Sequence, residues 1–366
     1  MKKLLFAALS LSLIFTSSCD KDGDKDEITA QLPSSYNFEN VNHSGQDQRL
    51  DMLSEIVSYA KTSNSGSAVN AQLMFDMMGN KNYQWQNTDL NSSSKQIASK
   101  LEADASLVMG DWIRLLDSIS QNPNTGSNGV AGLVSNQAGT KQYLFNEQGY
   151  ELAQLIEKGS IGALSYYQAT AVYTSSTKMN VDNDTVNPGK GTDMQHHWDE
   201  AFGYFSAPKN FAETSFSYDN TQDYHRFWVK YSHELNEVLG CDAKIMKAFI
   251  KGRNAINNNN LITRDVAITE LRQEWQKVCA GMAIHYLNGA KADFADDALR
   301  NHQLSEAVGF LWSLRFNPSS PLNAEAGDKI IKDSFSNLYE ITTSDINAAI
   351  DLIATNYGLQ SHKNHL

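Results

Sequence analysis

Residues 196–204 of this 366-residue chain read HHWDEAFGY, and residues 302–310 read HQLSEAVGF. Both stretches follow the pattern H-x-x-x-E-A-x-G-aromatic. In a helix, a histidine and a glutamate four residues apart lie on one face, and a nearby glycine lets a second helix approach closely. The two stretches therefore predict two related helices at different places in one fold.

A second pair of similar segments lies upstream of these stretches, in the same order. Residues 151–167 align without gaps on residues 270–286, and the identical pairs are Glu151/Glu270, Leu152/Leu271, Gln154/Gln273, Lys158/Lys277, Gly162/Gly281 and Tyr167/Tyr286. The distance between copies differs by about the length of the loop at 179–192, where an insertion costs little. We therefore predict a duplicated helical pair, with repeats at about 146–205 and 265–315. Chance convergence of two bundle helices is the alternative.

Hydrophobic residues recur at helical spacing over most of the chain. Apolar stripes at 50–60 and 107–119 predict helices before the repeats, whereas 121–141 and 179–192 read as loops. No alternating run is long enough to support a sheet. The other predicted helices are 146–174, 194–205, 223–239, 241–257, 263–289, 294–315, 323–338 and 343–357. The predicted fold class is all-α, with two pseudo-symmetric helical bundle halves and an extra N-terminal helical layer at 46–120.

The N-terminus predicts export and lipid anchoring. A short basic start, an apolar run at 4–15 and small residues before Cys19 are typical of a signal peptide cleaved at a lipidated cysteine. The apolar run is shorter than the roughly 20 residues of a membrane-spanning helix. We expect a signal peptide at 1–18, a lipidated flexible tether at 19–34 and a helical domain at 35–366. Ordinary secretion, with Cys19 incidental, is the alternative.

Composition narrows the class of partner. The formal net charge is −12, whereas nucleic-acid binding proteins present a basic face, so no nucleic-acid partner is expected. The expected partner is a membrane, reached through the lipid anchor, in an outer-membrane lipoprotein at the periplasmic face or the cell surface. Besides Cys19 the chain has only Cys241 and Cys279, which we expect to be two buried thiols. A single disulfide between them is the alternative.

The repeated block also carries the candidate chemistry. Imidazole and carboxylate groups on facing helices build metal sites in bundle cores. If the repeats face each other, the ligands would be His196, His197, Glu200, His302 and Glu306. The other interpretation is structural, namely hydrogen bonds within each helix and glycines that permit close packing. The chain has no H-E-x-x-H, G-x-S-x-G or P-loop motif, which favours a protein that is not an enzyme.

Three stretches resemble a known family. Residues 35–41 (SYNFENV), 196–205 and 305–318 are similar to an uncharacterised family of Bacteroidetes lipoproteins, a domain of unknown function. That family distantly resembles the imelysins, so the resemblance implies two related helical bundles and a role in iron or haem uptake. Imelysins carry a G-x-H-x-x-E motif. His197 and Glu200 would be its histidine and glutamate, while Gln195 stands where its glycine would be.

These observations lead to three hypotheses about function. The first is a lipid-anchored extracytoplasmic protein that binds iron, haem or another divalent metal in nutrient acquisition, alongside an outer-membrane transporter. The second is a metallopeptidase that uses His197 and Glu200. The third is a surface module that binds a glycan or a transporter partner. For a glycan, the tryptophans Trp228, Trp275 and Trp312 should include a solvent-facing pair.

Overall fold

The computed structural model describes residues 32–211 and 213–366. The signal peptide at 1–18, the lipidation site Cys19 and most of the tether at 19–34 lie outside the described residues, so these stay predictions. No helix in the described part of the chain is long and apolar enough to cross a membrane.

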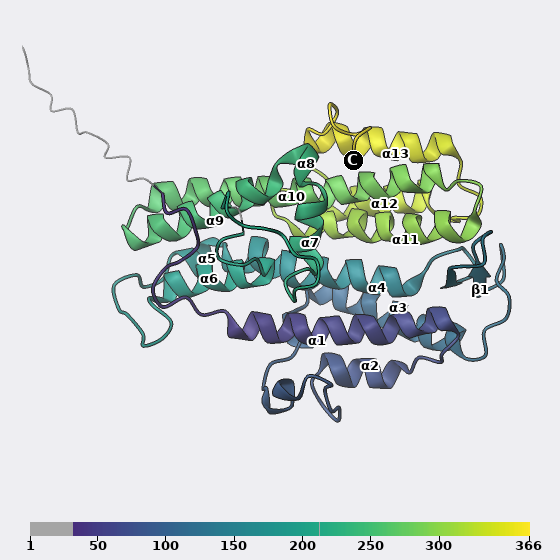
Figure 1. Cartoon of the computed structure of the whole chain (residues 1–366), viewed down its shortest axis with the longest axis horizontal. Helices are drawn as coiled ribbons and strands as arrows, with labels where there is room; N and C mark the ends of the chain where they lie inside the picture. The colour runs from purple at the N-terminus through teal and green to yellow at the C-terminus, as the bar shows by residue number, and fades with distance from the viewer. Residues whose placement is uncertain (1–31, 212) are drawn as a thin grey trace, which may run out of the picture. The chain divides into compact units, whose positions relative to one another are not determined.

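The described residues form an all-α fold with one small β-hairpin, which confirms the predicted fold class (Figure 1). The α-helices are α1 (Ser44–Lys61), α2 (Ala71–Met78), α3 (Ala103–Ser120), α4 (Leu152–Ile161), α5 (Ser176–Met179), α6 (Asp193–Phe205), α7 (Phe227–Glu234), α8 (Asn236–Leu239), α9 (Cys241–Asn257), α10 (Leu261–Ala292), α11 (Asp297–Ser313), α12 (Ala324–Ser334) and α13 (Thr343–Tyr357). Short 3₁₀ turns are η1 (Thr62–Ser65), η2 (Thr88–Ser92), η3 (Ala98–Lys100) and η6 (Leu314–Phe316).

Local capping sets several helix ends. Thr342 and Asp345 form a reciprocal capping box at the start of α13, and Thr192 and Gln195 do the same at the start of α6. The side chain of Asp296 accepts hydrogen bonds from two backbone amides at the start of α11. The predicted ranges of α9 and α13 agree with the structure. The capping box accounts for the start of α13, whereas α9 begins after Gly240 without a side-chain cap.

Each predicted repeat consists of a long helix followed by a second helix. In the first, α4 continues through the π-helical turns η4 (Gly162–Tyr166) and η5 (Gln168–Tyr173), and α6 follows. In the second, α10 is followed by α11. The second helix packs on the first in both cases, α6 against η5 and α11 against α10. The short helix α5 lies between the two helices in the first segment only, so the helix order agrees apart from α5. A twofold relation between the segments stays a prediction.

The N-terminal helices add a layer on the first repeat. Helices α1 and α3 both pack against α4 (Figure 1). Helix α1 also packs against α6, the helix that carries the first predicted histidine–glutamate block. Helix α11 packs on the same α4. Helix α4 thus lies between the N-terminal layer and the second repeat.

The π-helical turns in the first repeat have a local cause. The carbonyl oxygen of Ile161 accepts hydrogen bonds from the indole Nε1 of Trp228 at 3.1 Å and from the hydroxyl of Ser165 at 2.8 Å. Side chains that insert into the helical hydrogen-bond ladder widen it. A Cβ on Gly162 would overlap Ser313 of α11, so the glycine keeps α11 close at this point.

A β-hairpin begins within the predicted loop at 121–141 and ends just after it, and the sequence did not predict it. Strand β1 (Gly132–Ser135) pairs antiparallel with β2 (Gln142–Phe145), with Gly132 opposite Phe145. In the turn, the side chain of Asn136 accepts from two backbone amides and Gly139 adopts a φ of +66°. Strands of four residues are too short to show a clear alternating pattern.

Two further expectations concern buried groups. Cys241 and Cys279 are free, buried thiols, as predicted. Trp228 and Trp275 are fully buried and only 5% of Trp312 is exposed, so the predicted solvent-facing tryptophan pair does not exist. The glycan hypothesis loses that support.

Candidate functional site

The first histidine–glutamate block lies on α6 and is half-buried. His197 Nδ1 is 3.1 Å from Glu200 Oε2. The other carboxylate oxygen, Oε1, accepts hydrogen bonds from Gln46 of α1 at 3.0 Å and from the Tyr173 hydroxyl at 3.1 Å. The side chains of His197 and Glu200 are each 17% exposed. Within the described residues, no lysine or arginine forms an ion pair with Glu200.

These contacts determine the charges of the block. Burial alone would raise the pKa of Glu200, but hydrogen bonds from His197, Gln46 and Tyr173 and the field of His196 bring the pKa below its ordinary value. Burial lowers the pKa of His196, and its Nδ1 is buried with no hydrogen-bond partner among the described residues. Glu200 is therefore an ionised carboxylate at neutral pH, and the imidazole of His196 is uncharged.

The second block lies on α11 and belongs to a closed network of charges. His302 Nδ1 is 2.5 Å from Glu151 Oε2, and its Nε2 is 3.6 Å from Glu306 Oε2. The other oxygen of Glu306 lies 3.0 Å from Lys158 Nζ, which also contacts Glu157 at 3.2 Å. The three glutamates and the lysine are buried. Burial alone would lower the pKa of His302, but the hydrogen bond to Glu151 and the charges of Glu151 and Glu306 raise it above its ordinary value.

The two blocks perform the same packing role. In each, one residue of a neighbouring helix contacts both the glutamate and the glycine. Gln46 of α1 donates to Glu200, and a Cβ on Gly203 would lie 3.1 Å from the Gln46 Cβ. Lys158 of α4 pairs with Glu306, and a Cβ on Gly309 would lie 2.5 Å from the Lys158 Cβ. The repeated pattern therefore joins α6 to α1 and α11 to α4.

The stretch at 35–41 belongs to the same core. The Tyr36 hydroxyl donates to Asp199 Oδ1 at 2.6 Å, and Arg253 Nε donates to the same oxygen at 2.9 Å. The Tyr36 ring stacks on Phe202 with a centroid distance of 3.8 Å. All four side chains are buried. This stretch therefore fastens the chain before α1 to α6 and α9.

The structure does not bring the five predicted metal ligands together. His196, His197 and Glu200 lie on α6, which packs against α1 and η5, whereas His302 and Glu306 lie on α11, which packs against α4. Within residues 32–211 and 213–366, no group of three or more His, Cys, Asp or Glu side chains could hold a metal ion. The single metal centre that we expected is therefore replaced by two separate clusters. Glu200 is held by Gln46 of α1, whereas Glu306 is held by Lys158 of α4.

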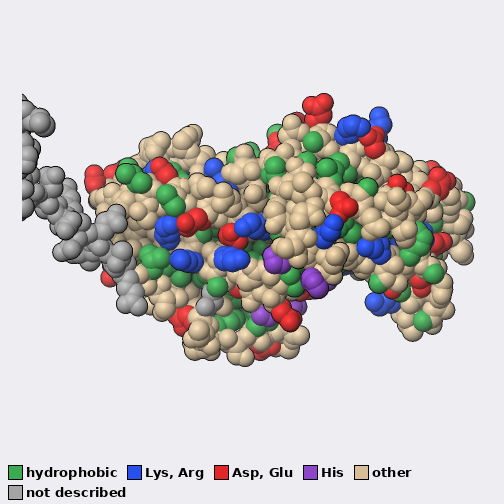
Figure 2. Space-filling view, turned by 90° about the horizontal axis from the view of Figure 1, so that it is seen from above, with side chains coloured by type: hydrophobic (Ala, Val, Ile, Leu, Met, Phe, Trp, Pro, Cys, Tyr) green, Lys and Arg blue, Asp and Glu red, His purple; other side chains and the backbone are tan. Residues whose placement is uncertain are grey.

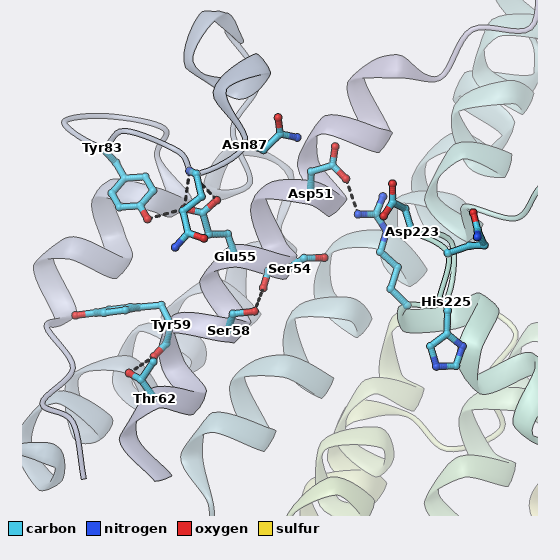
Figure 3. A pocket seen from close by; sticks show the side chains of 13 residues that line it. Asp51, Ser54, Glu55, Ser58, Tyr59, Thr62, Tyr83, Asn87, Asp223 and His225 are labelled. Atoms are coloured by element: carbon cyan, nitrogen blue, oxygen red, sulfur yellow. Dashed lines mark hydrogen bonds and ion pairs between the residues drawn. The ribbon is translucent and has the colours of Figure 1, made fainter. Parts of the chain in front are cut away.

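A polar pocket of about 650 Å³ lies over α1, at a place that no motif marks (Figure 3). We call it the α1 pocket. Its walls come from α1, from the loop after α2 and from the loop before α7. The lining residues are Asp51, Ser54, Glu55, Ser58, Tyr59, Thr62, Tyr83, Gln86, Asn87, Gln222, Asp223, His225 and Arg226. Carboxylate, hydroxyl and amide groups therefore surround the cavity beside two tyrosines.

Two carboxylates of the α1 pocket are held in place (Figure 3). Glu55 accepts a hydrogen bond from the Tyr83 hydroxyl at 2.6 Å and another from the Gln86 amide at 3.1 Å. Burial and the bond to Glu55 raise the pKa of Tyr83 to about 12, so the hydroxyl stays protonated. Asp51 forms an ion pair with Arg226 at 2.5 Å. These contacts fasten both loops to α1.

The family of the chain is identified by its sequence. Residues 33–359 match the model of a family described as a domain of unknown function, DUF4856. The chain belongs to this family. No curated protein and no solved structure shows significant similarity to the chain. The DUF4856 domain thus includes both histidine–glutamate blocks and the whole α1 pocket.

One sequence signal in the DUF4856 domain does point to the α1 pocket. Asp51, Ser54, Glu55, Ser58 and Thr62 recur at helical spacing and form a polar stripe along α1. Such a stripe usually marks a solvated face, so it carries no prediction by itself. The two loops that close over the stripe convert it into a pocket, and their positions depend on tertiary contacts.

Proposed function

We propose that this chain is a lipid-anchored, extracytoplasmic binding protein that holds a saccharide or another polyhydroxylated molecule in the α1 pocket. The signal-peptide pattern and Cys19 support export and anchoring. The chemical groups that line the pocket are the observation that favours this class of ligand. Carboxylates, hydroxyls and amides together offer donors and acceptors that match the hydroxyl groups of a sugar. Its volume lies in the range typical of small-molecule sites.

The geometry of the pocket favours binding because its charged groups are already positioned. Glu55 is fixed by Tyr83 and Gln86, and Asp51 is fixed by Arg226. A ligand therefore does not have to order these side chains, and less conformational entropy is lost on binding. The rings of Tyr59 and Tyr83 supply surfaces on which the apolar face of a sugar ring can pack.

A glycan array followed by calorimetry tests this proposal. Residues 32–366 form one compact unit, so the processed chain without the signal peptide suits the assay. Ser58 is exposed on α1 at the pocket, and Ser58→Trp fills the cavity. Ser106 is exposed on α3 away from the pocket, and Ser106→Trp is the matched control. We expect saccharide binding that Ser58→Trp weakens at least tenfold and Ser106→Trp leaves unchanged. Failure of all glycans to bind, or equal effects of the two variants, would refute the proposal.

A second candidate function is binding of iron, haem or another divalent metal on α6, in partnership with an outer-membrane transporter. One observation favours it: Glu200 is an ionised, half-buried carboxylate held by neutral donors and His197, next to the unpartnered Nδ1 of His196. The resemblance to imelysins supports the same reading. A metal would need a ligand beyond these residues, such as water. A metallopeptidase needs the same further ligand and a general base, and is not proposed.

Calorimetry with Fe²⁺, Zn²⁺, Cu²⁺ and hemin separates this candidate from the first. Glu200→Gln should abolish the heat of binding, whereas Glu306→Gln is the matched control because Lys158 already neutralises Glu306. Micromolar binding that only Glu200→Gln removes would support a metal site on α6. Absence of binding by all four probes would end the metal hypothesis and leave the α1 pocket untouched.

A further inference from the structure

An apolar groove runs between α3 and α12, on a part of the molecule that neither candidate function uses. It consists of two adjoining cavities of about 490 and 550 Å³. Both are bordered by Val108, Trp312, Arg315 and Asp328. The floor lies on α11 and on the long helix that begins with α4. We call this feature the α3–α12 groove.

One wall of the groove is an apolar stripe on α3. Val108, Trp112 and Leu115 recur at spacings of four and three residues and all border the second cavity. Val108 is 37% exposed and Leu115 is 40% exposed, so both ends of the stripe face solvent. The ring of Trp112 packs edge-on against Trp312 at a centroid distance of 4.9 Å. Large side chains of this kind usually lie inside a protein or at a binding site.

A single cation stands between the two cavities. The Arg315 guanidinium lies 5.0 Å from the ring centroid of Trp312, and its Nε donates to the Trp312 carbonyl oxygen at 2.8 Å. Its terminal nitrogens pair with Asp328 of α12. The Arg315 side chain is 15% exposed, whereas Asp328 is 58% exposed. The arginine is thus fixed in the groove, and its anionic partner lies at the surface.

The other wall, α12, is the more weakly held. Gly327 is the only residue of α12 that is fully buried, and Ile330 and Ile331 pack on the core while partly exposed. A helix with so little buried surface can shift at a small cost in free energy. The Asp328 side chain is also 58% exposed, so it can turn away from Arg315 into solvent.

We propose that the α3–α12 groove binds a small apolar molecule that carries a ring system and one anionic group. The ring system would lie against Val108, Trp112 and Trp312, and the anion would replace Asp328 at Arg315. Three features support this ligand class. The cavities have the size of small-molecule sites, most of their exposed lining is apolar, and Arg315 is the one basic side chain that borders them, beside the carboxylates of Glu102, Asp104 and Asp328. Arginine held over an aromatic ring is well suited to bind a carboxylate or sulfonate.

Fluorescence titration with the aromatic sulfonate 8-anilinonaphthalene-1-sulfonate tests the proposal on the processed chain. We expect saturable binding at one site. Val108→Glu places a carboxylate in the groove and should weaken binding at least tenfold. Leu107→Glu is the matched control, because Leu107 is 71% exposed on the same helix and borders neither cavity. Asp328→Asn should tighten binding several-fold, because Arg315 then lacks its competing carboxylate.

A neutral probe of similar shape, N-phenyl-1-naphthylamine, isolates the role of charge. Its binding should fall with Val108→Glu but stay unchanged with Asp328→Asn. Thermal unfolding of each variant establishes that the fold is intact, since loosely folded chains also bind such dyes. Equal losses with Val108→Glu and Leu107→Glu would refute the site. Weaker sulfonate binding by Asp328→Asn would refute the role of Arg315.

Discussion

Replacement of Lys158 by methionine should destabilise the fold strongly, because Lys158 is the central cation of the buried network between α4 and α11. Its side chain is 2% exposed and contacts Glu306 at 3.0 Å and Glu157 at 3.2 Å. Its ammonium group also lies 5.1 Å from the ring centroid of Tyr231. Burial alone would lower the pKa of Lys158, but the field of Glu157 and other groups raises it well above the ordinary value. The lysine is therefore charged in the folded protein.

The size of the effect follows from the charges that remain. Glu157 keeps an ion pair with Lys61, so its charge stays compensated. Among the described residues, Glu306 then keeps only His302 as an ion-pair partner, at 3.6 Å, and it is buried. Removal of one partner from a buried ion pair typically costs about 3–5 kcal/mol. That is a large part of the roughly 5–15 kcal/mol that stabilises a typical domain.

Urea unfolding followed by circular dichroism measures the change. Lys158→Met should lower the free energy of unfolding by about 3–5 kcal/mol. The double variant Lys158→Met, Glu306→Gln should recover at least about 2 kcal/mol, because the uncompensated carboxylate is gone. A loss below about 1 kcal/mol for the single variant, or no recovery in the double variant, would refute the reasoning.

Three further predictions concern the same elements. The raised pKa of His302 means that its stabilising contribution is complete below the ordinary histidine pKa of about 6.5 and is lost as the pH rises through the raised value. Unfolding curves of wild type and His302→Asn should therefore differ most near pH 6 and converge at alkaline pH, and a pH-independent difference would contradict this. Gly309→Ala places a Cβ 2.5 Å from the Lys158 Cβ and should cost about 1–3 kcal/mol of stability by overpacking. Gly327→Ala, where the nearest atom lies 3.8 Å away, should instead stabilise α12 by about 0.5–1 kcal/mol. Urea unfolding measures both variants, and equal effects would show that the close approach at Gly309 is unimportant. Trp228→Phe removes the indole donor to the Ile161 carbonyl and should cost about 1–3 kcal/mol of stability. Hydrogen exchange in η4 and η5 should become faster, and unchanged exchange there would show that Trp228 does not stabilise the π-helical turns.

The helices were largely predictable because their signals are local. The capping box of Thr342 and Asp345 marks the start of α13, and hydrophobic periodicity marks most of the helices. The repeated stretches 196–204 and 302–310 do form helices that follow longer helices. The shared glycine has the expected role in both, since Gly203 and Gly309 each face a close neighbour.

The partners of the two histidine–glutamate pairs, and therefore the role of each pair, come from residues far away in the chain. Glu200 binds Gln46 and Glu306 binds Lys158, and each pair is separated by more than a hundred residues. Spacing along one helix shows which side chains share a face, but not which helix faces them. The two pairs therefore read alike in the sequence, although one is half-buried beside neutral donors and the other is closed by a lysine.

The sequence by itself determined the helical class, the ends of several helices and the family, because hydrophobic periodicity, capping and residue identity are properties of contiguous residues. Only the tertiary structure decided where the pockets lie. Asp51 and Arg226 meet across the α1 pocket, and Arg315 and Asp328 meet across the α3–α12 groove. Each cavity is bounded by elements whose relative position follows from packing of the whole core, and packing depends on shape complementarity that no local pattern encodes.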